Sequence, residues 1–154
     1  MNRRIALIGI YLSLLLTGCG SESATVESGL RTVPMQIGSK QFTLEVADSF
    51  STREHGLMQR DSMPELHGMI FVFEDETDRD FYMKNTRFPL EILFLDHTGK
   101  IVSISTMQPY DLSLTSSSGA AKYAIELNVG STQKVGVKVG QVLDIPADAR
   151  EPKK

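Results

Sequence analysis

The chain has 154 residues, of which 41% are hydrophobic and 23% charged, and this suffices for one domain with an apolar core. Its formal net charge is −3, so it lacks the basic excess that nucleic-acid binding needs, and we expect no nucleic-acid partner. A single cysteine excludes an internal disulfide and a cysteine-based zinc site. The sequence predicts neither a cofactor nor a metal site.

The amino terminus has the pattern of a lipoprotein signal peptide. A cationic start, Met1-Asn2-Arg3-Arg4, precedes an apolar run, Ile5 to Leu16, which is too short to span a bilayer comfortably. The run ends in Leu16-Thr17-Gly18-Cys19, where small residues precede a cysteine, as at a lipoprotein cleavage site. We therefore expect residues 1–18 to be removed and Cys19 to carry the lipid that anchors the protein to a membrane.

The residues after the cysteine predict a tether in the bacterial cell envelope. Residues 19–34 are mostly small and polar and have no period, which is typical of a flexible linker. Gly20 stands where an aspartate often retains a lipoprotein at the inner membrane, and this favours the outer membrane. The domain would face the periplasm or the exterior. Removal of Arg3 and Arg4 leaves 14 basic residues against 19 acidic ones, a formal charge of −5.

Residues 35–147 predict one mainly β domain, followed by a polar tail at 148–154. Residues 41–47 alternate apolar and polar side chains, which is typical of a half-exposed strand that pairs with 35–37 as a hairpin. Other strands are expected at residues 68–73, 79–84, 90–95, 101–107, 122–127 and 142–145. There is no βαβ alternation, so about eight short strands would form a sandwich or partly closed barrel.

One or two short helices are expected beside these strands. Ser51-Thr52-Arg53-Glu54 has the spacing of a capping box, in which the serine hydroxyl accepts a free amide and the glutamate reaches back, so a helix is predicted at about 52–59. A one-turn helix is predicted between a Ser131 cap and Gly136. An acidic turn is expected at 74–78 and a flexible loop at 113–119.

The stretch at 90–95 is apolar on both faces except at Glu91, so it predicts a central strand that is buried on both sides. A buried carboxylate must be paired or hydrogen-bonded, or its pKa rises. We expect Arg53 to pair with Glu91 or with Glu126.

Several blocks of the sequence resemble a known family. They are Arg53-Glu54-His55-Gly56-Leu57-Met58, Gly68 to Phe73, Phe81 to Asp96, Glu126-Leu127-Asn128 with Gly130, and Gly136 to Gly140. Their order and spacing are similar to those of the bacterial and archaeal domain-of-unknown-function family 192. The resemblance implies a mostly β fold and a secreted or membrane-tethered location, and it implies no established activity.

The chain departs from the usual family pattern at three places. Tyr82 stands where a tryptophan is common, Glu91 where an aspartate is common, and Arg87-Phe88 replaces a more aliphatic pair.

Five polar residues in these blocks are candidates for a ligand site, because a simple apolar core needs none of them. They are Arg53, Asn85, Thr86, Glu91 and Glu126. Together they would form a pocket for a polar ligand such as a sugar or a cell-wall fragment. The alternative is that they satisfy one another at buried corners of the fold.

The sequence favours an envelope lipoprotein whose non-catalytic β domain binds a polar ligand or an envelope protein. Two alternatives remain open. One is copper handling in the periplasm, since thioether and imidazole ligands suit copper; its candidates are Met58, Met63, Met69, Met83, His55 and His67. The other is a hydrolase with Glu91 as acid or base, although no known catalytic motif is present and no catalytic residue is assigned.

Overall fold

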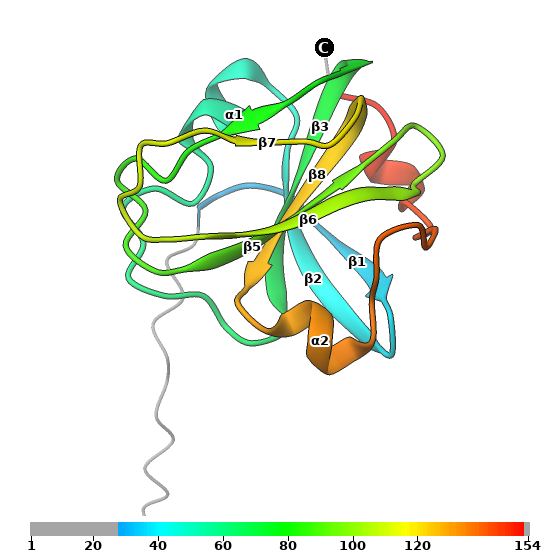
Figure 1. Cartoon of the computed structure of the whole chain (residues 1–154), viewed down its shortest axis with the longest axis horizontal. Coiled ribbons are helices and arrows are strands. Elements are labelled where there is room, and N and C mark those ends of the chain that lie inside the picture. Colours follow the sequence, from blue (N-terminus) through cyan, green and yellow to red (C-terminus); the bar gives the residue numbers. More distant parts are fainter. Residues whose placement is uncertain (1–27, 153–154) are drawn as a thin grey trace, which may run out of the picture.

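The computed structural model of the chain describes residues 28–152, which form a sandwich-like β domain (Figure 1). Eight strands and two short α-helices make up this part of the chain, and its main sheet does not close into a barrel. The mainly β fold class is therefore confirmed. The signal peptide, Cys19 and most of the predicted tether lie outside the described residues.

Six strands form the main sheet in the order β1-β2-β3-β8-β5-β6. The β2 and β3 strands pair in parallel, and the other neighbours are antiparallel. The bounds are β1 Thr32–Ile37, β2 Lys40–Ala47, β3 His67–Thr77, β5 Leu90–Leu95, β6 Ile101–Met107 and β8 Ala121–Asn128. Two short strands, β4 (Asp80–Phe81) and β7 (Thr115–Ser116), form a separate two-stranded sheet.

The sheet buries apolar side chains on both faces. Successive residues of a strand point to opposite faces, so β8 sends Tyr123, Ile125 and Leu127 to one side and Ala124 and Glu126 to the other. The first core, on the Ile125 side, is completed by β1, β2, the helix α2 (Ser131–Val135) and the carboxyl-terminal segment. The second core lies on the Ala124 side, and residues 57–63 and 81–88 contribute to it.

The predicted central strand is confirmed. β5 lies between β8 and β6, and all six of its residues are buried. The hairpin of β1 and β2 is also confirmed, and so are the short helix α2 and its end at Gly136. The prediction that Ser131 caps this helix is wrong: Ser131 is the first helical residue, and Gly130 stands at the cap position and offers no side chain. In Figure 1, α1 (Phe50–His55) and β7 lie on one side of the sheet, while α2 and the carboxyl-terminal segment lie on another.

The start of α1 differs from the capping box that was predicted. Ser49 caps this helix: its Oγ accepts a hydrogen bond from the Thr52 amide at 3.2 Å, and the Thr52 Oγ1 accepts one from the Ser49 amide at 3.0 Å. The prediction used Ser51 and Glu54, which are two residues further along. A threonine replaces the glutamate of the box, and Glu54 is therefore free to face the pocket described below.

Other boundaries also differ. β3 continues to Thr77 through the predicted acidic turn, because this acid-rich end of the strand is exposed and its charges remain solvated. The strand expected at 79–84 is reduced to β4, and the strand expected at 142–145 is reduced to one bridge between Lys100 and Val142. β1 begins at Thr32, inside the stretch that was predicted to be tether.

Candidate functional site

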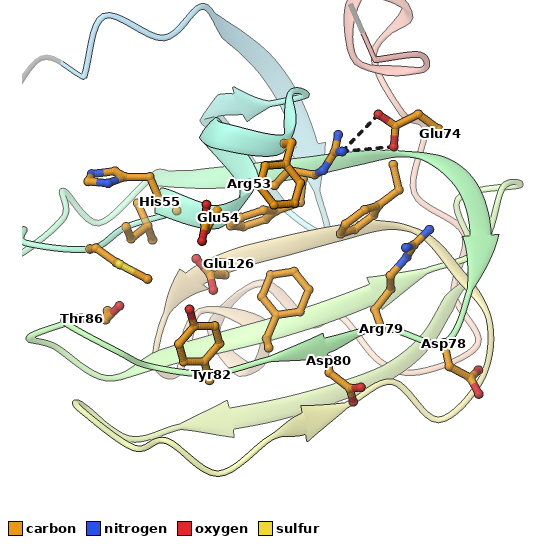
Figure 2. A pocket seen from close by; sticks show the side chains of 17 residues that line it. Arg53, Glu54, His55, Glu74, Asp78, Arg79, Asp80, Tyr82, Thr86 and Glu126 are labelled. Atoms are coloured by element: carbon orange, nitrogen blue, oxygen red, sulfur yellow. Dashed lines mark hydrogen bonds and ion pairs between the residues drawn. The ribbon is translucent and has the colours of Figure 1, made fainter.

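A pocket of about 440 Å³ opens on the side of the second core (Figure 2). It lies between α1, the middle of β3, the segment around β4 and the end of β8. This volume is in the range of small-molecule sites in proteins. Its charged or titratable lining groups are Arg53, Glu54, His55, Glu74, Asp78, Arg79, Asp80, Tyr82 and Glu126.

Aromatic rings form the apolar part of the pocket wall. The Phe81 ring meets Phe71 edge-on with 5.0 Å between centroids, and it meets Phe94 in the same manner at 5.5 Å. Phe50 and Tyr82 also line the pocket and are 76% and 38% exposed, so they stand at its mouth. The pocket therefore combines a fixed aromatic floor with solvent-facing rings.

Glu126 is the buried polar group of this pocket. It is 5% exposed and lies in the strand register beside Met69 of β3 and Ile92 of β5, both of which are fully buried. Neighbours in register point to the same face, so apolar side chains flank the carboxyl on both sides. Its side-chain carboxyl makes no hydrogen bond and no ion pair with residues 28–152, and it opens onto the cavity.

The environment of Glu126 changes its protonation. Burial raises the pKa of this carboxyl to about 8, although the positive charge of Arg60 acts to lower it. At neutral pH the free protein therefore holds a neutral carboxylic acid at the back of the pocket. Such a group can donate one hydrogen bond, or it can lose its proton to a cation that arrives.

Arg53 does not pair with either glutamate that the sequence suggested. Its guanidinium donates to both carboxylate oxygens of Glu74, at 3.1 Å each, and to the backbone carbonyls of Asp48 and Val72 at 3.1 and 2.9 Å. This network attaches α1, which buries no residue of its own, to β3. Arg53 thus forms part of the pocket wall and is already neutralised.

Arg79 forms the opposite part of the wall and is also neutralised. Its guanidinium donates to the Asp75 carboxylate and to the carbonyl of the same residue, at 2.6 Å each, and to the Ala121 carbonyl at 3.2 Å. Its central carbon lies 3.9 Å from the centroid of the Phe73 ring, and that of Arg53 lies 5.3 Å from it. Both are cation–π contacts.

Glu91 lies on the other face of the sheet, toward α2. Its two carboxylate oxygens accept hydrogen bonds from the backbone amides of Gly130, at 2.8 Å, and Thr132, at 3.0 Å. These amides belong to the start of α2, so Glu91 stabilises the beginning of that helix. Glu91 does not line the pocket, and the expectation that it would meet Arg53 is wrong, because strand alternation turns Glu91 to the face of the sheet opposite the pocket that Arg53 lines.

Two of the five candidates are turn residues beside the pocket. Asn85 is exposed and has a φ of 56°, a left-handed conformation that asparagine tolerates better than most residues, and its carbonyl accepts from Gln59 at 2.8 Å. Thr86 is buried and lines the pocket. The structure therefore brings Arg53, Thr86 and Glu126 together and leaves Asn85 and Glu91 outside.

The methionines considered for copper are mainly core residues. Met69 and Met83 are 0% and 2% exposed, and both belong to the second core together with Met63. Across residues 28–152 there is no group of three or more His, Cys, Asp or Glu side chains that could hold a metal ion. Nor does this part of the chain contain a helix long and apolar enough to cross a membrane.

Several pocket residues were not among the sequence candidates, notably Glu54, Phe81, Arg79 and Tyr82. A usable signal was the spacing of Phe71 and Phe73, which places two aromatic rings on one face of a strand. A third ring follows soon after them at position 81. The first two rings lie on β3 next to the charged residues at its end, and ligand sites are typically lined by aromatic side chains with a few polar groups.

The fold is that of a small β domain with one mixed sheet of six strands and a second sheet of two strands. The chain belongs to the family DUF192, described as "Uncharacterized ACR", whose model matches residues 33–145. Among curated proteins, none is similar enough to this chain to count as a relative.

Two solved structures are similar to the chain. A protein from Sinorhizobium meliloti 1021, described as a candidate transcription regulator, is 34% identical, with a TM-score of 0.68 over 73% of this chain and 91% of that one. A protein of unknown function from Novosphingobium aromaticivorans DSM 12444 is 28% identical, with a TM-score of 0.70 over 79% of this chain and 90% of that one.

Proposed function

We propose that the protein is a lipid-anchored receptor of the bacterial cell envelope and that its β domain binds a small polar ligand in the pocket of Glu126. The observation that carries the proposal is the state of this carboxyl. It is 5% exposed, it faces a cavity of about 440 Å³, and no group among residues 28–152 bonds to it. The carboxyl is not sealed inside the core but opens onto the cavity, where a ligand that enters can bond to it.

The remainder of the pocket suits binding better than catalysis. Arg53 and Arg79 are held by acidic partners and by backbone carbonyls, so neither is free to act as a mobile acid. The aromatic wall offers a fixed surface for the ligand body, and Glu126 offers one directional contact. A few placed polar groups in an apolar cleft are typical of ligand sites.

The anchor is the second part of the proposal. The signal pattern and Cys19 support a lipid at the first residue of the mature protein, and the small polar residues after it would hold the domain away from the bilayer. A role in transcription regulation, which the description of the S. meliloti structure gives for that protein, is not part of the proposal, because a chain with a net charge of −3 lacks the basic footprint that DNA binding needs.

Ligand binding is tested on the domain from residue 28 onward, labelled with ¹⁵N and ¹³C. It is titrated with glucose, N-acetylglucosamine, muramyl dipeptide and the amines used below, and amide and side-chain shifts are followed by NMR. We expect saturable shifts that are confined to α1, the segment around β4 and the end of β8. Absence of saturable shifts with every compound would overturn the receptor proposal.

The anchor is tested in cells with the variant Cys19→Ser. We expect the wild-type protein in the detergent-soluble membrane fraction with acyl chains detected by mass spectrometry. The variant should lack acyl chains and should be recovered in the aqueous fraction or as the uncleaved precursor. A wild-type protein with an unmodified Cys19 would refute the anchor and leave the pocket proposal untouched.

A further inference from the structure

We infer that the pocket of the proposed function takes an organic cation: a small molecule that carries an ammonium group on an apolar or ring-shaped body, with the Glu126 carboxylate as its counter-ion. This rests on the proposed function and narrows its ligand class. It is carried by the charge balance of the pocket, by the unpaired carboxyl and by the aromatic rings around it.

The pocket has an excess of acidic groups. Five carboxyl groups and two guanidinium groups line it, and the two guanidinium groups are already committed to Glu74 and Asp75. Glu54, Asp78 and Asp80 then remain with no ion pair among residues 28–152. Asp80 accepts one hydrogen bond from a serine hydroxyl of β7, which does not change its charge. An arriving cation is attracted and an anion is repelled.

Glu126 supplies the specific contact. In Figure 2 its carboxyl group, that of Glu54 and the hydroxyl of Tyr82 point into the same space between α1 and the strands. An ammonium group is positively charged and accepts no hydrogen bond, and in a primary amine it also donates through its N–H groups. It therefore suits a carboxylate to which no group of the protein donates a hydrogen bond. A metal ion would need more oxygen ligands than this site offers, because the described residues contain no group of three candidate ligands.

The aromatic rings suit the same occupant. The guanidinium carbons of Arg79 and Arg53 lie 3.9 and 5.3 Å from the centroid of the Phe73 ring, so an aromatic ring of this pocket already contacts cations in the folded protein. Phe50 and Tyr82 stand at the mouth and are partly exposed, and their faces can meet a further cation. The volume of about 440 Å³ admits an amine of drug-like or smaller size.

Binding of a cation is coupled to release of a proton. The free carboxyl of Glu126 has a pKa of about 8, so at pH 7 it is about 90% protonated. When the ammonium group binds, the O–H bond of the carboxyl breaks, its proton passes to the buffer, and the carboxylate pairs with the cation. About 0.9 proton is released per ligand at pH 7, and the affinity rises about 90-fold between pH 6 and pH 9.

Other charged or titratable groups on the neighbouring elements line the same pocket or act on Glu126 through their charge. α1 contributes Arg53, Glu54 and His55, and Arg60 follows in the turn after that helix. β3 contributes Glu74, and the segment from Asp78 to Tyr82 contributes the rest. The variant Glu126→Gln separates their effect from that of Glu126, because it removes only the titrating carboxyl and keeps the side-chain shape.

The probes are two cations, each with a neutral counterpart of nearly the same shape. Choline is compared with 3,3-dimethylbutan-1-ol, and cyclohexylammonium with cyclohexanol. Isothermal titration in buffers of different ionisation enthalpy gives affinity and proton release together. We expect both cations to bind at least tenfold more tightly than their counterparts, with about 0.9 proton released at pH 7. We expect Glu126→Gln to abolish the release and to weaken binding at least tenfold.

The control variant is Glu65→Gln, an exposed carboxylate outside the pocket that is paired with Lys134, and it should bind as the wild type does. Suppose that a neutral sugar binds saturably at the pocket and that the cations bind no more tightly than their neutral counterparts. This result would overturn the inference and leave the receptor proposal standing. Cation binding without proton release, or binding unchanged in Glu126→Gln, would also overturn it. No binding by any compound would overturn both.

Discussion

Replacing Glu126 with glutamine should change how the stability of the domain depends on pH. Glu126 has a pKa of about 8 in the folded protein against 4.5 as the ordinary value, so between these pH values the folded state binds more protons than the unfolded state. The stability that this group contributes is fully present below pH 4.5 and is lost as the pH rises toward 8. The variant Glu126→Gln has no carboxyl at this position, so its stability should not fall in this pH range for this reason.

The magnitude follows from the size of the shift. A difference of one pKa unit corresponds to about 1.4 kcal/mol, and the interval from pH 5 to pH 7 lies wholly within the window. The free energy of unfolding of the wild type should therefore fall by about 2 to 3 kcal/mol more than that of Glu126→Gln over this interval.

Urea unfolding at 25 °C, followed by circular dichroism at pH 5, 6, 7 and 8, measures this difference. The control is Glu65→Gln, because the hydrogen bond from Lys134 lowers the pKa of Glu65 and keeps this group ionised in both states above pH 5. Its free energy of unfolding, plotted against pH, should run parallel to that of the wild type. If the curve of Glu126→Gln were also parallel to the wild type, Glu126 would not be an unpaired buried carboxyl and the account of the pocket would fail.

Two further predictions concern the framework of the site. Glu91→Ala removes the acceptor of the Gly130 and Thr132 amides and should lower the unfolding free energy by about 3 kcal/mol, whereas Glu91→Gln keeps one acceptor and should cost less; equal urea midpoints for the three proteins would contradict this role. Gly68→Ala places a methyl group 2.6 Å from the Glu126 carbonyl oxygen, so β3 and β8 must separate, at a cost of about 2 to 3 kcal/mol. A variant with an unchanged thermal midpoint would refute the close approach of these strands.

The central strand and the fold class were predictable from sequence because they depend on local patterns. A continuous apolar run bounded by a proline and a turn defines β5, and the alternation of residues 41–47 defines β2. The end of helix α2 was recognisable from Gly136, although the predicted cap, Ser131, is the first residue of the helix. These features need no information about which strands are neighbours.

The composition of the site depended on long-range packing and was only partly predictable. Glu91 and Glu126 both occur in apolar strands, and the sequence offers no means of telling which one is bonded. The answer depends on strand alternation, which turns Glu91 toward the amides of α2 and Glu126 toward the pocket. The partner of Arg53 was likewise hidden, because the exposed end of β3 was read as a turn, and this end carries Glu74.

The most direct test of the account is a pH titration of the Glu126 side-chain carboxyl by ¹³C NMR, assigned by the loss of its signal in Glu126→Gln. The account predicts a midpoint near 8 in the free domain and a midpoint well below 7 with choline present at saturation. A midpoint near 4.5 in the free domain would contradict the buried, unpaired carboxyl. A midpoint that choline does not move would contradict its role as counter-ion of the ligand.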